Sequence, residues 1–211
     1  MKTALLLGAT GLVGGCLLDQ LLSDPRYDTV VALVRRPLNR QHPKLRQEIL
    51  DFDHPDPALL RGDDLFSALG TTLRKAGSKE TQYRIDCTYP YEIGKIARAN
   101  GVRQYLLVSS VGADAGSSNF YLRTKGDLEE KIRALGFDTF VSVRPSFLLG
   151  NRAEFRLGER IGIALAQAFA FLIPKRYRGV QAAAVAAVLI EKANAGLSGV
   201  VVVESEGILG A

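Results

Sequence analysis

Gly8-Ala9-Thr10-Gly11-Leu12-Val13-Gly14 is the stretch that decides the fold of this 211-residue chain. It follows an apolar run at 4–7 and precedes leucines at helical spacing, at positions 17, 18, 21 and 22. This order predicts a buried strand, a glycine turn and a helix whose first N–H groups and positive dipole end attract a phosphate. Gly8 allows a sharp turn, Gly11 allows close approach to a pyrophosphate, and Gly14 allows close packing of helix and strand. The stretch therefore predicts a dinucleotide site.

The same N-terminal segment has a second interpretation. Lys2, followed by mostly apolar or small residues up to Cys16, also has the composition of a lipoprotein signal peptide. The residues after Cys16 continue a helical period instead of opening a polar linker, so we favour the strand, turn and helix.

Composition indicates one soluble globular domain. Hydrophobic residues make up 47% of the chain and charged residues 23%, and no uncharged apolar run approaches the length of a membrane span. The two cysteines, Cys16 and Cys87, lack metal-ligand spacing and are expected to be buried thiols. Free thiols are typical of a reducing compartment, so we expect a cytoplasmic protein.

The net charge of +5 indicates an anionic ligand. Basic residues cluster at 35–46 and 74–79 without interleaved aromatic residues or a nucleic-acid motif, so an anionic cofactor is a simpler partner than nucleic acid. His42 and His54 are the only histidines, and both lie in proline-containing segments. We therefore predict neither a metal site nor a Ser/His/Asp triad.

Strand and helix patterns alternate along the chain. Beyond the first strand, strands are predicted at 29–34, 47–50, 65–69, 104–109, 139–143 and 200–203, and helices at 78–100 and 118–135. This alternation predicts a single α/β domain over residues 1–211, a doubly wound, Rossmann-like parallel sheet.

Two apolar helical stretches, 157–172 and 179–195, follow Gly150. We expect the region 151–195 to contribute a small C-terminal helical cap over the substrate. Lateral packing on the sheet is the alternative, and the pattern does not separate the two.

The end of the second predicted strand indicates which dinucleotide binds. An acidic residue there bonds the 2′-hydroxyl of NAD, but this chain has Arg35 and Arg36. Two guanidinium groups suit a 2′-phosphate through forked, charge-assisted hydrogen bonds, which predicts NADP(H) as the cofactor. The alternative is a solvated arginine pair without a ligand.

Tyr121 and Lys125 lie four residues apart on a predicted helix, so their side chains share one face. Tyr121 would exchange a proton with a carbonyl oxygen during hydride transfer, while Lys125 would stabilise the phenolate and bond the nicotinamide ribose. Ser110, just after the fifth strand, would hold the same oxygen. This set predicts an NADP(H)-dependent oxidoreductase acting on a small carbonyl or alcohol.

A different class of function is also open. A regulatory protein could bind NADP(H) without catalysis and use the bound state to engage a protein partner. Such a sensor needs only the binding residues, so the Tyr, Lys and Ser set favours the enzyme.

The chain resembles the atypical short-chain dehydrogenases similar to the Tat-interacting protein. Its Gly-x-x-Gly-x-x-Gly spacing is that of extended and atypical members, not the Gly-x-Gly-x-x-Gly of ordinary dehydrogenases. The likeness covers nearly the whole chain and also rests on Val34-Arg35-Arg36, Leu69-Gly70-Thr71-Thr72, Lys75-Ala76-Gly77-Ser78, Ser109-Ser110, Tyr121 with Lys125-Gly126, and Arg144-Pro145 with Leu148-Leu149-Gly150 and Arg152.

The resemblance implies further cofactor contacts. It assigns the pyrophosphate to Thr10, Gly11, Leu12 and Val13, the 2′-phosphate to Arg35 and Arg36, the adenosine side to Leu69 and Gly70, and the nicotinamide end to Leu148 and Arg156. The chain departs from the pattern at Ser146-Phe147, where a small residue is usual after Arg-Pro. That ring alters the expected substrate pocket, so the resemblance supports the cofactor more than any substrate.

Overall fold

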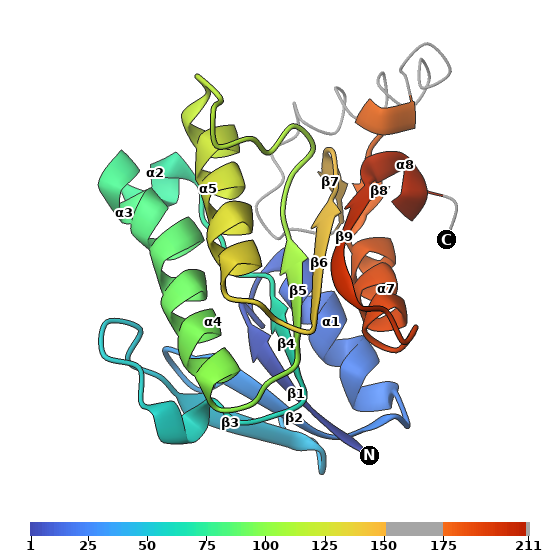
Figure 1. Cartoon of the computed structure of the whole chain (residues 1–211). Coiled ribbons are helices and arrows are strands. Elements are labelled where there is room, and N and C mark those ends of the chain that lie inside the picture. The colour runs from blue at the N-terminus through green and yellow to red at the C-terminus, as the bar shows by residue number, and fades with distance from the viewer. Residues whose placement is uncertain (151–174, 210–211) are drawn as a thin grey trace.

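A computed structural model of the protein describes residues 1–150 and 175–209. Most strands and helices alternate along these residues, as the sequence pattern predicts, but no helix separates the strand at 27–34 from that at 45–49, or the strand at 139–144 from that at 148–149 (Figure 1). The strands are β1 (Lys2–Leu7), β2 (Tyr27–Val34), β3 (Leu45–Ile49), β4 (Asp64–Ser67), β5 (Gln104–Val108), β6 (Thr139–Arg144), β7 (Leu148–Leu149), β8 (Val180–Gln181) and β9 (Gly199–Glu204). The α-helices are α1 (Leu12–Ser23), α2 (Leu73–Ala76), α3 (Lys79–Tyr83), α4 (Tyr89–Ala99), α5 (Phe120–Ala134), α7 (Ala182–Ala193) and α8 (Ser205–Ile208).

Within the described ranges, seven parallel strands form the main sheet in the order β3-β2-β1-β4-β5-β6-β9. The chain moves outward from β1 to β3, then returns to β4 on the other side of β1. This reversal makes a doubly wound, Rossmann-like sheet, which confirms the predicted fold class. Ligands of such sheets bind at the carboxyl ends of the strands beside the reversal, where the glycine turn lies.

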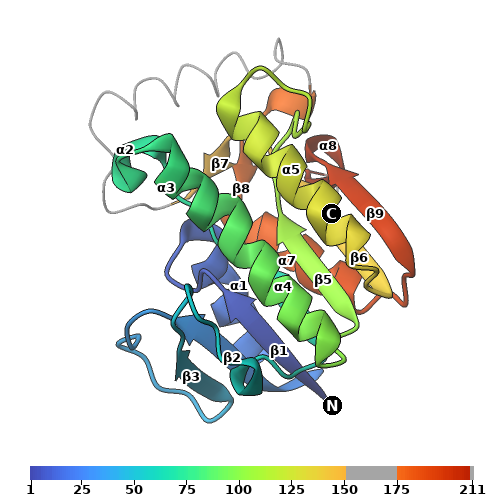
Figure 2. The same cartoon turned by 60° about the vertical axis from the view of Figure 1, so that its left-hand side comes forward.

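Helices cover both faces of the sheet (Figures 1 and 2). The alternation of side chains along β1 sends Ala4 and Leu6 into a core with α1 and α7, and Leu5 and Leu7 into a core with α4 and α5. All four of these side chains are fully buried. β1 is therefore buried on both faces, which explains its continuous apolar run.

The second helical stretch predicted for the cap packs elsewhere. Residues 182–193 form α7, whose buried side chains include Val185, Val188 and Leu189 and which lies against α1 on one face of the sheet. The expectation that 179–195 joins a cap was wrong, because the apolar face of α7 is used by the sheet core. The other stretch, 157–172, lies outside the described residues.

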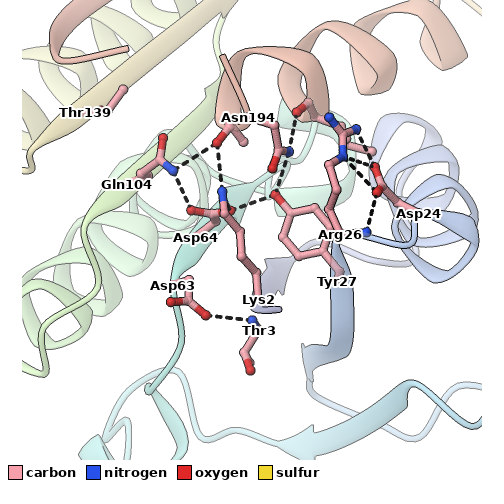
Figure 3. Close-up of polar contacts among 12 residues, drawn as sticks. Lys2, Thr3, Asp24, Arg26, Tyr27, Asp63, Asp64, Gln104, Thr139 and Asn194 are labelled. Carbon is pink, nitrogen blue, oxygen red and sulfur yellow. Dashed lines mark hydrogen bonds and ion pairs between the residues drawn. The ribbon is translucent and has the colours of Figure 1, made fainter. Parts of the chain in front are cut away.

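Polar contacts hold the amino ends of the central strands together (Figure 3). Asp64 Oδ2 accepts hydrogen bonds from Lys2 Nζ at 3.0 Å and the Tyr27 hydroxyl at 2.7 Å, and Oδ1 accepts one from Gln104 Nε2 at 2.8 Å. Burial and the Asp64 carboxylate raise the pKa of Tyr27, so its hydroxyl remains a donor. Residues 2–23 thus form an integral strand and helix, as in the favoured interpretation of the N-terminal segment.

The predicted helix over 78–100 is continuous but irregular. Residues Arg84–Thr88 form a π-helical turn between α3 and α4. Pro90 in the first turn of α4 has no N–H to donate and its ring crowds the carbonyl one turn earlier, which favours such a widened turn. π turns recur at functional sites, and this one carries the buried Asp86.

Candidate functional site

The turn between β1 and α1 presents free helix N–H groups. Gly8 has a φ of +82°, and its carbonyl oxygen accepts a hydrogen bond from the Gly11 N–H at 2.8 Å. α1 begins at Leu12 with Gly11 as N-cap, and no described side chain caps the first turn. The first N–H groups of α1 are therefore open to an anion. Thr10 is exposed, whereas the Val13 side chain packs in the core, so Val13 can contact a ligand only through its backbone.

The arginine pair lies beside this turn. Arg35 and Arg36 directly follow β2, whose residue Leu33 is in register with Leu7 at the end of β1. Both arginines are exposed, and neither guanidinium has a hydrogen bond or ion pair with a described residue. Two positive side chains thus remain open at the edge that carries the glycine turn.

Tyr121 and Lys125 form a pair at the start of α5. The Asn119 side chain caps this helix by accepting hydrogen bonds from the first N–H groups, which places Tyr121 in the first turn. Lys125 Nζ is 6.0 Å from the centroid of the Tyr121 ring. Lys125 is only 4% exposed, and its ammonium has no hydrogen bond or ion pair within the described part of the chain. Tyr121 is 39% exposed and can meet a ligand from solvent.

Ser110 lies in the loop that follows β5. This loop packs tightly on α5 at Gly126. A Cβ built on Gly126 would lie only 2.2 Å from backbone atoms of Asp114 and Ala115, so no side chain fits between the loop and the helix. Gly126 follows Lys125 directly, so the close contact holds the Ser110 loop against the helix that carries the Tyr–Lys pair. Ser110 is half-buried, and its hydroxyl makes a long 3.4 Å hydrogen bond to the Val111 carbonyl oxygen.

The remaining predicted residues fall on the same edge of the sheet. Gly70 follows β4, and a Cβ built on it would lie 3.8 Å from Lys125 Nζ, while the half-buried Leu69 packs on the core. Leu148 belongs to β7, two residues before Gly150, which lies against the Leu12 side chain. Arg156 lies outside the described residues.

The groups along this edge fit an anionic dinucleotide. They combine the free N–H groups of α1, two open guanidinium groups and a buried ammonium without a bonded partner in the described chain. In the same ranges, no group of three His, Cys, Asp or Glu side chains is arranged to hold a metal ion. No helix over these residues is both long and apolar enough to cross a lipid bilayer.

Sequence reasoning missed Asp86. This residue is 1% exposed on the π turn, and its Oδ1 accepts a hydrogen bond from the Thr71 N–H at 2.7 Å. Oδ2 is buried without a hydrogen-bond partner among the described residues. Burial raises the pKa of Asp86, while the Lys125 ammonium, the Thr71 N–H and the Gln82 side chain lower it by less. The nearby Pro90 was the one local signal of an irregular helix.

Sequence reasoning also missed Glu129, one turn beyond Lys125. Its Oε1 accepts hydrogen bonds from Ser109 Oγ, from Ser142 Oγ at 2.8 Å and from Arg144 Nε at 3.0 Å, and Oε2 accepts one from Arg144 Nη2 at 2.6 Å. Glu129 is 3% exposed. This buried carboxylate ties α5 to the ends of β5 and β6 and so fixes the residue next to Ser110. No spacing rule in the sequence indicates such a contact.

The fold and the groups at the sheet edge define a nucleotide-binding protein of the Rossmann class, and the chain belongs to the family described as NAD(P)H-binding, which matches residues 8–195. Among curated relatives, the mitochondrial protein fmp52 of Aspergillus niger is 35% identical over 190 residues, covering 86% of this chain and 80% of its own length. HTATIP2 of Rattus norvegicus is 38% identical over 164 residues, covering 75% of this chain and 67% of its own. The resemblance drawn from the sequence motifs is confirmed.

Solved structures of distant proteins share the fold. MoeE5 in complex with UDP-glucose and NAD has a TM-score of 0.73 at 17% identity, covering 96% of this chain and 75% of its own. The enzyme WbmH of Bordetella bronchiseptica in complex with NAD⁺ has a TM-score of 0.70 at 16% identity, covering 97% of this chain and 76% of its own. These likenesses show that the chain shares its Rossmann-like fold with proteins solved in complex with NAD.

The expected cytoplasmic location was wrong. Relatives from Aspergillus niger, Candida glabrata and Candida albicans are all named mitochondrial proteins. The expectation rested on Cys16 and Cys87, which are indeed free thiols. Free thiols indicate only the absence of an oxidising compartment such as the secretory pathway, so they do not single out the cytosol.

Proposed function

We propose that this protein is an NADP(H)-dependent oxidoreductase that acts on a small carbonyl or alcohol. The observation that supports the proposal most is the Tyr121–Lys125 pair, with a buried ammonium 6.0 Å from the ring of a solvent-accessible tyrosine. The pair lies at the start of α5, near the edge of the sheet that carries the glycine turn. A protein that only binds nucleotide needs no such pair.

Each side chain then has a distinct task. Tyr121 donates a proton to the substrate oxygen in reduction and accepts one in oxidation. The Lys125 ammonium stabilises the phenolate that remains, and its burial strengthens this effect because solvent screens it little. Ser110 orients the substrate oxygen by a hydrogen bond. The bound dinucleotide supplies or accepts the hydride.

The choice of NADP(H) over NAD(H) rests on Arg35 and Arg36. Their guanidinium groups have no hydrogen bond or ion pair with a described residue, and no carboxylate directly follows β2 to meet a ribose 2′-hydroxyl. The function is tested by incubating the purified protein with NADPH and a panel of small aldehydes and ketones while following NADPH absorbance. Saturable oxidation with one of them supports an enzyme, whereas tight NADPH binding with no turnover across the panel supports a regulatory nucleotide sensor.

Removal of either arginine side chain should weaken the binding of NADPH much more than the binding of NADH. A charge-assisted hydrogen bond contributes about 1.5–3 kcal/mol, so Arg35→Ala or Arg36→Ala should raise the Kd of NADPH by roughly 10- to 100-fold. The Kd of NADH, which lacks the 2′-phosphate, should change by less than about twofold, because the lost bonds were never made. Fluorescence titration with both nucleotides measures the two constants.

Arg40→Ala is the matched control. Arg40 lies on the same loop, and its substitution removes the same charge. Unlike Arg35 and Arg36, its guanidinium is paired with a carboxylate, that of Asp19. An equal loss of NADPH and NADH affinity in Arg35→Ala and Arg36→Ala would refute the assignment of these residues to the 2′-phosphate.

A further inference from the structure

Gly70 lies between two buried side chains of opposite charge that come from different helices. A Cβ built on Gly70 would lie 3.8 Å from Asp86 Oδ1, 3.9 Å from Asp86 Oδ2 and 3.8 Å from Lys125 Nζ. The two side chains are 1% and 4% exposed. A carboxylate on the π turn and an ammonium on α5 therefore flank the exposed Gly70. Because both charged side chains are buried, solvent and salt screen their attraction little.

We infer that Asp86 is the counter-ion of Lys125 and a positioning residue for the Tyr121–Lys125 pair. It acts through Lys125, by drawing the ammonium toward Gly70 at the sheet edge. Its role in turnover rests on the function proposed above. The coupling between the two charges does not, and it can be measured on the protein without substrate.

The hydrogen bonds of Asp86 differ from those of a carboxylate that serves only the fold. Oδ1 accepts the Thr71 N–H at 2.7 Å and so fixes the loop after β4, but Oδ2 is buried with no hydrogen-bond partner among the described residues. The buried Glu129, in contrast, uses both oxygens. A buried oxygen without a bond is unfavourable unless a nearby charge compensates it, and the Lys125 ammonium on α5 is such a charge.

None of the other titratable groups considered near Asp86 provides a positive charge in place of the Lys125 ammonium. Burial raises the pKa of the Cys87 thiol and of the Tyr83 phenol, so both are uncharged at neutral pH. The charges of Lys131 and Asp127, also on α5, affect the pKa of Cys87, which Lys131 lowers and Asp127 raises. Lys125 is the charged side chain that lowers the pKa of Asp86 against the effect of burial.

The coupling is tested by NMR titration of the cofactor-free protein with isotope-labelled aspartate carboxyl groups, the Asp86 signal being assigned with Asp86→Asn. Lys125→Met should raise the pKa of Asp86 by about one pH unit, because it removes the compensating ammonium. Lys131→Met, on the same helix, is the control and should leave it unchanged. Equal Asp86 titration midpoints in the two methionine variants would overturn the inference.

Asp86→Asn supplies the second readout. Asparagine can still accept the Thr71 N–H, so only the charge is lost. Because burial raises the pKa of Asp86, ionisation lowers the stability of the folded state as the pH rises from 3.8 through that raised pKa. The variant should therefore match the wild-type Tm near the acidic end of this range and exceed it by about 2–4 °C at pH 7.

Turnover separates positioning from a structural role. In Asp86→Asn we expect kcat to fall about tenfold with the fold intact, because the Lys125 ammonium is no longer held toward Gly70 and a misplaced catalytic group lowers the rate. A lower Tm at pH 7 with unchanged kcat would mean that Asp86 is structural and would overturn the inference. If wild-type protein shows no turnover while Lys125→Met still shifts the Asp86 titration, the proposed function fails and the charge coupling stands.

Discussion

Tyr121→Phe is expected to lower kcat for NADPH-dependent carbonyl reduction by about 10²- to 10⁴-fold, the usual contribution of one general acid. The substitution removes only the hydroxyl. The phenylalanine ring can keep its place 6.0 Å from Lys125 Nζ, and a side chain that is 39% exposed contributes little to the core. The Kd of NADPH and the Tm should therefore stay close to wild type. Stopped-flow or steady-state assays, together with a nucleotide titration, measure these quantities.

Tyr91→Phe is the matched control for this prediction. Tyr91 also has a lysine over its ring, with Lys131 Nζ at 5.1 Å, but it lies on α4 and has no part in the proposed Tyr121, Lys125 and Ser110 set. Its variant should retain wild-type kcat. Equal rates for wild type and Tyr121→Phe would remove Tyr121 from the mechanism.

Gly14→Ala is expected to have the largest effect on stability. A Cβ built on Gly14 would lie 1.9 Å from the Gly8 carbonyl oxygen and 2.6 Å from the Gly8 carbonyl carbon. Both partners are backbone atoms, so relief requires moving either α1 or the turn that follows β1. We expect a loss of more than about 4 kcal/mol in the free energy of unfolding, measured by urea denaturation, or a chain that does not fold.

Gly15→Ala, one residue further along, is the control. Its Cβ would be 3.8 Å from the nearest atom, the Ala9 carbonyl oxygen, which is an ordinary contact. Alanine is favoured over glycine inside a helix, so this variant should gain about 0.5–1 kcal/mol. Opposite signs for neighbouring Gly→Ala substitutions would establish the close contact of α1 with the turn, and similar values for the two would contradict it.

Local patterns predicted most of the fold. The run at 4–7, the glycine turn and the leucines of α1 are contiguous signals, and each matches one element of the structure. The shorter β3 and β4 were weakly indicated because charged and polar residues share those strands. The destination of the apolar stretch 179–195 could not be predicted, since a helix that covers a sheet and one that covers a ligand have the same periodicity.

The candidate site was predictable only where its residues are close in sequence. The spacing of Tyr121 and Lys125 reveals a common helix face, and Arg35 and Arg36 follow a recognisable strand. Asp86 could not be found in this way, because its importance depends on Thr71 and Lys125, which meet it only in the folded chain. The contacts of Glu129 with β5 and β6 are of the same kind.

The proposed function requires that the glycine turn and the arginine pair together bind a phosphorylated adenine dinucleotide. Isothermal titration calorimetry of the purified protein with NADPH, and with NADH in a parallel experiment, tests it most directly. We expect saturable one-site binding of NADPH, at least about tenfold tighter than that of NADH, because Arg35 and Arg36 would bond the 2′-phosphate. No saturation by NADPH at millimolar concentrations would contradict it.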